Sequence, residues 1–70
     1  MAQFALYAYR DDTGDADYRF ICEVEDFDEA DFQVQVLEAS DEWPESFLPL
    51  MRDQLNSAES IYDGDCWEPL

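Results

Sequence analysis

Two segments in the N-terminal third of the chain alternate between two sets of side chains, as β-strands do. They are residues 3–10, QFALYAYR, and residues 18–25, YRFICEVE. Their aromatic and β-branched residues favour an extended backbone. Residues 11–17, DDTGDAD, separate the two segments and carry the Asp and Gly typical of a turn. The pattern therefore predicts two strands joined as an antiparallel hairpin.

A third strand is predicted over residues 32–38, FQVQVLE, where Phe32, Val34 and Val36 alternate with other side chains. Glutamine at two of the intervening positions indicates that one face of the sheet meets solvent, as in antiparallel sheets. Residues 26–31, DFDEAD, are too charged for a buried strand. We expect them to form a loop or a single helical turn.

The C-terminal third has apolar residues at helical spacing. After a connection at residues 39–45, Ser46 is the expected N-cap, Pro49 falls in the first turn and Gly64 ends the helix. The periodic positions are Phe47, Leu50, Met51, Leu55, Ala58, Ile61 and Tyr62. The sequence thus predicts one α+β domain over residues 1–70. Its expected fold is a three-stranded antiparallel sheet with one C-terminal helix packed on one face, in the order βββα.

Charge adds a functional constraint to this picture. Nineteen Asp and Glu oppose three Arg, with no Lys and no His, so the formal net charge is -16. Solubility accounts for a magnitude of about 2 to 8 in a small domain, and a larger charge destabilises the compact state. A hydrophobic content of 47% nevertheless predicts a folded chain. We therefore expect a basic partner, and no direct binding to nucleic acid or to an anionic membrane.

The two cysteines, Cys22 and Cys66, are too few for a small secreted disulfide scaffold. The N-terminal stretch MAQFALYAYRDD has no basic region before its short apolar run, so no secretory signal is expected. No stretch approaches the length of a membrane span. We expect a cytoplasmic protein with two reduced thiols, with Cys22 in the core.

The side chains of common catalytic sites are missing. Without His or Lys, catalytic triads, Schiff bases and most zinc sites are excluded, and two glycines cannot build a phosphate-binding loop. Residues 11–17 and 63–68, DGDCWE, offer carboxylates for calcium, but neither has the spacing of the twelve-residue calcium loop. We therefore expect no enzyme activity, no cofactor and no metal site.

The carboxylates are concentrated in a few segments. VEDFDEAD, residues 24–31, holds five in eight positions. Side chains two apart on a strand lie about 6.6 Å apart, comparable to phosphates along one nucleic-acid strand, and Glu23 and Glu25 have that spacing. The candidate partner-binding residues are Glu23, Glu25, Asp26, Asp28, Glu29, Asp31, Asp41, Glu42, Trp43 and Glu45.

Three aromatic residues allow two interpretations. Trp43, which lies between Glu42 and Pro44 on an expected loop, would suit an anchor in a basic groove, and it would equally suit a lid on the core. Tyr7 and Tyr9 share one strand face, where their rings would either cover the sheet or bind a partner.

In its overall character the chain resembles small, very acidic, single-domain phage proteins that act as DNA mimics. These include anti-restriction proteins, uracil-DNA glycosylase inhibitors and anti-CRISPR proteins. The resemblance rests on size, on the near absence of basic residues, on the aromatic-rich core and on the segments DDTGDAD, EVEDFDEAD and SDEWPE. It extends over the whole chain but includes no alignable motif, so no residue role is carried over.

The resemblance implies inhibition without chemistry, by occupying the basic surface that a nucleic-acid-binding complex uses for its target. Within this class we favour an anti-CRISPR protein, monomeric or homodimeric, that blocks target-DNA binding by a CRISPR effector complex in the host bacterial cytoplasm. Three alternatives remain. One is an acidic adaptor or antitoxin-like module whose basic partner is unrelated to DNA. Another is a halophilic protein whose acidic surface serves solvation. The third is a calcium-binding module, which stabilisation by micromolar calcium would favour.

Overall fold

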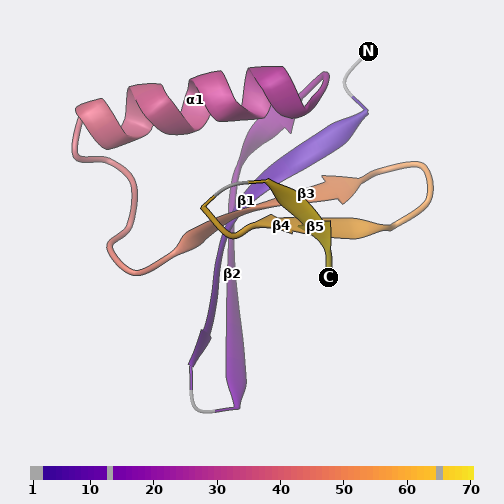
Figure 1. Ribbon diagram of the computed structural model, residues 1–70, viewed down its shortest axis with the longest axis horizontal. Coiled ribbons are helices and arrows are strands. Elements are labelled where there is room, and N and C mark those ends of the chain that lie inside the picture. The colour runs from indigo at the N-terminus through magenta and orange to yellow at the C-terminus, as the bar shows by residue number, and fades with distance from the viewer. Residues whose placement is uncertain (1–2, 13, 65) are drawn as a thin grey trace.

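The computed structural model describes residues 3–12, 14–64 and 66–70, so Thr13 of the predicted turn and Asp65 of the acidic segment 63–68 lie outside the described residues. The elements are β1 (Phe4–Asp12), β2 (Asp15–Val24), α1 (Phe27–Ala39), β3 (Leu48–Asp53), β4 (Glu59–Tyr62) and β5 (Trp67–Pro69). The strands form one antiparallel sheet in the order β2-β1-β3-β4-β5, and α1 lies across one face of it (Figure 1).

The predicted N-terminal hairpin is confirmed by the pairing of β1 with β2. Leu6 pairs with Cys22 and Tyr7 with Phe20, so Ile21 has no partner and forms a bulge in the edge strand β2. Strand β3 pairs with β1 only between Phe4 and Tyr9. The end of the hairpin therefore projects beyond the other strands (Figure 1).

The predicted strand over residues 32–38 is wrong, because this segment belongs to α1. The buried residues of α1 are Ala30 and Val34, one helical turn apart, and Phe27 packs against the same core. Phe32 and Val36, which the predicted strand would have turned inward, are exposed on the helix, at 61% and 44%. Residues 26–31, expected as a loop or a single turn, instead supply the N-cap and the first turns of this helix.

The predicted C-terminal helix is also wrong, because its residues form β3, a turn and β4. Three consecutive residues of β3, Pro49, Leu50 and Met51, are buried, since the strand lies inside the sheet between β1 and β4. Pro49 is tolerated there because β4 pairs with β3 only from Leu50 to Arg52. Ser46, the expected N-cap, has a φ of 71° in the turn before β3. The fold is thus a five-stranded sheet with its helix between the second and third strands, not βββα.

The core lies between α1 and the sheet. Its buried members are Leu6, Val24, Ala30, Val34 and Met51. An aromatic chain closes one side: the Phe27 ring lies 5.3 Å from Phe4 and 5.1 Å from Trp67, between centroids. Among the described residues no charged or polar residue is buried, so the carboxylates surround this core at the surface.

The face of the sheet opposite α1 has no helix over it (Figure 1). Tyr7 contacts Phe20 and Tyr9 contacts Tyr18, with centroid distances of 5.6 and 5.0 Å. Burial has the largest effect on the pKa of Tyr9, which it raises, and the nearby Asp11, Tyr18 and Glu59 raise this pKa further. The two tyrosines of β1 therefore cover the sheet by pairing with rings of β2.

Candidate partner-binding surface

The carboxylates at the start of α1 have structural roles. The backbone N–H of Glu29 donates to Asp26 Oδ1 over 2.9 Å, and the N–H of Glu25 donates to Glu29 Oε2 over 2.7 Å. This reciprocal arrangement is close to a capping box. Asp28 and Glu29 lie in the first turn, where the helix dipole favours negative charge. Three of the five carboxylates in VEDFDEAD, those of Asp26, Asp28 and Glu29, therefore stabilise the beginning of the helix.

The end of α1 has the opposite electrostatics. The N–H of Glu42 donates to Leu37 O over 2.9 Å and that of Asp41 to Glu38 O over 3.2 Å, which is the Schellman pattern, with Asp41 at a φ of 58°. The last turn has no basic residue. Glu38, Asp41 and Glu42 thus lie at the end of α1 where the helix dipole concentrates negative charge.

The loop at residues 40–47 continues this acidic end and is organised by two aromatic residues. The Trp43 Nε1–H donates to Phe47 O over 2.9 Å, and the Trp43 ring packs against the core. Glu45 is exposed between them. Trp43 is therefore a partial lid on the core, and the same ring also borders two surface hollows.

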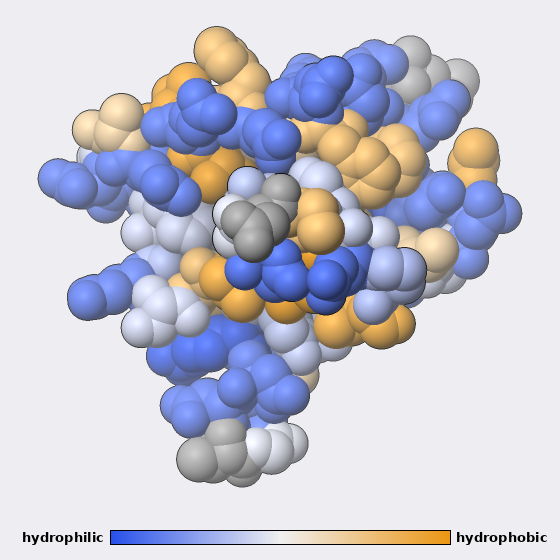
Figure 2. All heavy atoms as spheres, viewed as in Figure 1, coloured by the Kyte–Doolittle hydropathy of each residue, from blue (hydrophilic) through white to orange (hydrophobic). Residues whose placement is uncertain are grey.

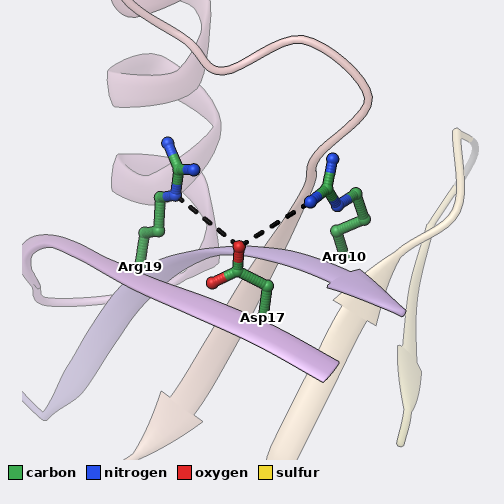
Figure 3. Close-up of polar contacts among 3 residues, drawn as sticks. All are labelled: Arg10, Asp17 and Arg19. Atoms are coloured by element: carbon green, nitrogen blue, oxygen red, sulfur yellow. Dashed lines mark ion pairs between the residues drawn. The ribbon is translucent and has the colours of Figure 1, made fainter. Parts of the chain in front are cut away.

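Phe47 of this loop contacts two arginines of the hairpin through cation–π interactions. The guanidinium carbons of Arg10 and Arg19 lie 4.8 and 4.6 Å from the centroid of the Phe47 ring, and each guanidinium lies 3.9 Å from Asp17 Oδ2. Figure 3 shows the Asp17 carboxylate between the two arginine side chains. The third arginine, Arg52, pairs with Glu59 at 3.9 Å. Every arginine of the chain thus has an acidic partner on the sheet.

The acidic end of α1 has no such partner. Among the described residues, none of its carboxylates forms an ion pair with an arginine, although Arg19 borders the neighbouring hollow. We call this set the C-terminal acidic cluster. Its members are Glu38, Asp41, Glu42 and Glu45. Figure 2 shows hydrophilic residues along α1 and at the end of the hairpin, with hydrophobic residues between them.

The candidate residues do not form one surface. Glu23 lies on the sheet face opposite α1, beside Tyr7 and Arg52. Strand β2 ends at Val24, so the strand spacing expected for Glu23 and Glu25 does not apply. The remaining candidates are Asp26, Asp28, Glu29 and Asp31 in the first half of the helix segment, and Asp41, Glu42, Trp43 and Glu45 after its end.

A hollow of about 430 Å³ opens between α1, the 40–47 loop and the end of β4. Asp31, Gln35 and Glu38 line it from the helix, and Trp43 and Tyr62 line it from the other elements. Gln35, Glu38 and Tyr62 were not among the site residues predicted from the sequence. The spacing of Asp31, Gln35 and Glu38 at i, i+4 and i+7 would have placed them on one side, had the helix been recognised.

Among the described residues, neither the cysteines nor the acidic segment 63–68 is assigned a ligand. Both thiols are free, and burial first, then Glu29, raises the pKa of Cys22. Ligand atoms of Asp63, Cys66 and Glu68 lie within 4.8 Å of one another, but all three residues are exposed. Exposed acidic groups are often this close without binding a metal ion, so we assign none here.

Comparisons with known proteins leave the function to be inferred from this surface. No protein-family model matches the chain, and the comparisons with curated proteins and with solved structures found no match. Within the described residues, no helix is long and apolar enough to cross a membrane.

Proposed function

We propose that this protein is a non-enzymatic inhibitor that binds the basic, nucleic-acid-binding surface of a protein complex through the C-terminal acidic cluster. The observation that supports this is the position of Glu38, Asp41 and Glu42 at the negative end of α1 without a basic residue in the last turn. Each such charge costs about 0.3–1 kcal/mol of stability. A basic partner would supply the missing counter-charges.

The mechanism requires only complementary charge on a rigid support. Arg and Lys side chains that normally hold phosphates would pair with the carboxylates of the cluster. Asp28 and Asp31 extend the negative surface along the helix, because Asp28 lies about 15 Å from Glu38 at 1.5 Å per residue. Central, desolvated pairs would give most of the affinity, while outer charges would speed association in a salt-sensitive way.

The resemblance to small acidic phage proteins favours one target within this class. We propose a CRISPR effector complex, whose target-DNA channel is positively charged. The protein would then act in the cytoplasm of a bacterial host.

The first test is capture of a partner. The immobilised protein is incubated with bacterial lysate that contains added CRISPR effector complexes, with and without excess duplex DNA. A captured nucleic-acid-binding complex that DNA displaces would support the proposal. Capture that DNA leaves unchanged would contradict DNA mimicry and favour an adaptor.

The second test measures inhibition of target-DNA binding with matched variants. Asp41→Asn/Glu42→Gln/Glu45→Gln removes three charges of the cluster and should weaken inhibition at least about tenfold. Asp11→Asn/Asp12→Asn/Asp15→Asn removes three charges at the projecting end of the hairpin and should change inhibition less than about threefold. Equal effects of the two variants would contradict a site at this cluster.

Residues at the start of α1 are less suitable for this test. Neutralising Asp26, Asp28, Glu29 and Asp31 together would remove the helix cap as well as the charge, because Asp26 and Glu29 both accept backbone hydrogen bonds. Asp28→Asn/Asp31→Asn leaves those bonds in place and tests the same surface.

A further inference from the structure

We infer that the hollow beside α1 receives a single arginine side chain of the basic partner. The identity of the partner rests on the proposed function, whereas the binding of arginine can be tested without any partner. The hollow lies between the C-terminal half of α1, the 40–47 loop and the turn after β4, which Figure 1 shows on one side of the molecule.

The walls of the hollow are apolar and aromatic. Val34 contributes from α1, Trp43 and Phe47 from the loop, and Tyr62 from β4. The volume of about 430 Å³ is within the range of small-ligand sites, about 300–1,000 Å³. Trp43 is held in place because its Nε1–H donates to Phe47 O over 2.9 Å. The hollow is therefore formed before a ligand arrives, which reduces the entropy lost on binding.

The rim of the hollow is negatively charged. Asp31 and Glu38 are seven residues apart, two turns along the same side of α1, with a rise of about 10.5 Å. Asp63 lines the hollow from the turn after β4. A cation that enters between these elements would meet carboxylates from two directions. An anion would be repelled, and an apolar side chain would desolvate the carboxylates without pairing them.

Arginine fits this combination of walls and rim better than lysine does. A guanidinium group is planar and weakly hydrated, stacks on aromatic rings and binds carboxylates through two parallel hydrogen bonds. The protein already uses this chemistry at the same loop, where Arg10 and Arg19 lie 4.8 and 4.6 Å from the Phe47 ring centroid. The ammonium group of lysine is more strongly hydrated and offers no plane to stack.

The test is an NMR titration of the 15N-labelled protein with N-acetyl-arginine amide. The indole N–H signal of Trp43 should shift in a saturable way, while that of Trp67, which does not line the hollow, should shift little. The citrulline analogue has nearly the same shape without the charge, and it should bind at least about tenfold more weakly. Equal binding of citrulline would overturn a cation site, and equal binding of the lysine analogue would overturn the assignment to arginine.

Matched variants test the rim. Asp31→Asn/Glu38→Gln should weaken arginine binding at least about tenfold. Asp12→Asn/Asp15→Asn makes the same change of charge at the hairpin end and should alter binding less than about twofold. Dispersed spectra of both variants establish that they are folded. Unchanged binding by the Asp31/Glu38 variant would overturn the inference.

The same variant separates this inference from the proposed function. If Asp31→Asn/Glu38→Gln loses arginine binding but still inhibits a captured complex fully, the hollow is not the receptor for the partner, and the proposed function stands. If arginine binds as expected but no nucleic-acid-binding complex is captured, the proposed function fails, and the ligand class of the hollow stands.

Discussion

Asp26 and Asp41 are exposed carboxylates at opposite ends of α1. The helix dipole gives a positive potential at Asp26 and a negative potential at Asp41. Asp26 accepts a hydrogen bond from the Glu29 N–H, at the end of the helix where unpaired N–H groups favour an anion. Asp41 has a φ of 58° at the end of α1 where the helix dipole is negative. Both its backbone conformation and its charge are therefore unfavourable. A residue that stabilises neither the backbone nor the local charge is a good candidate for a role in binding.

Replacing Asp41 tests this cost directly. Asp41→Gly should raise the free energy of unfolding by about 1 kcal/mol, because glycine adopts the left-handed conformation without strain and removes the charge. Asp41→Asn keeps a side chain and removes only the charge, so it should give a smaller gain of about 0.3–1 kcal/mol. Urea unfolding at neutral pH measures both. A loss of stability in either variant would contradict this account of the helix end.

At the scale of elements, the turn between β3 and β4 shows why a helix was expected and does not form. Asp53 Oδ1 accepts hydrogen bonds from the N–H groups of Leu55 and Asn56, over 2.8 and 3.2 Å. These side-chain bonds offer the backbone an alternative to helical pairing. Ser57 follows with a φ of 59°, which reverses the chain. Leu55, whose spacing suggested a helix, is left 77% exposed.

This turn predicts a pH dependence. The hydrogen bond from the Leu55 N–H lowers the pKa of Asp53 most; burial opposes it, and the hydrogen bonds from Asn56 lower the pKa further. A depressed folded-state pKa gives stability that is present above the unfolded-state value, about 3.9, and is lost as pH falls through the folded-state value. The stability difference between the protein and Asp53→Asn should therefore be larger at about pH 7 than at about pH 2 in urea unfolding. An equal stability difference at the two pH values would contradict a lowered pKa of Asp53 in the folded state.

The same elements show what the sequence can and cannot predict. The hairpin was predictable because its turn and both strands are local. The helix was missed because Phe32, Val34 and Val36 fit a strand period, whereas the face that α1 buries is marked by Ala30 and Val34. The decisive signal was the cap, Asp26 with Glu29. The run of consecutive buried residues in β3 fits either a helix or a strand, and only the pairing of β3 with β1 and β4 decides between them.

The candidate site was predictable to a similar extent. Composition identified negative charge and the segments that carry it. The separation of helix-capping acids from the C-terminal acidic cluster depends on where α1 begins and ends. The stacking of Arg10 and Arg19 on Phe47 joins residues distant in sequence, and no local pattern indicates it.

At the scale of the whole molecule, a net charge of -16 predicts how stability responds to salt. Repulsion between exposed charges falls as the Debye length shortens, from about 30 Å at 0.01 M to about 10 Å at 0.1 M and about 3 Å at 1 M. The free energy of unfolding should therefore rise between about 0.01 M and 0.5 M sodium chloride and then change little. Urea unfolding across this series measures it. A steep rise that continues through several molar salt would contradict a screening effect and favour a halophilic protein.

The placement of the arginines also bears on proteolysis. Trypsin cleaves after arginine and lysine, and this chain has three arginines and no lysine. Arg10, Arg19 and Arg52 lie within β1, β2 and β3, where each is in a paired position. A protease must bind an extended, unpaired segment, so every tryptic site requires part of the sheet to open first. Tryptic digestion of this protein therefore reports how often the sheet opens, and a ligand that stabilises the fold should slow it.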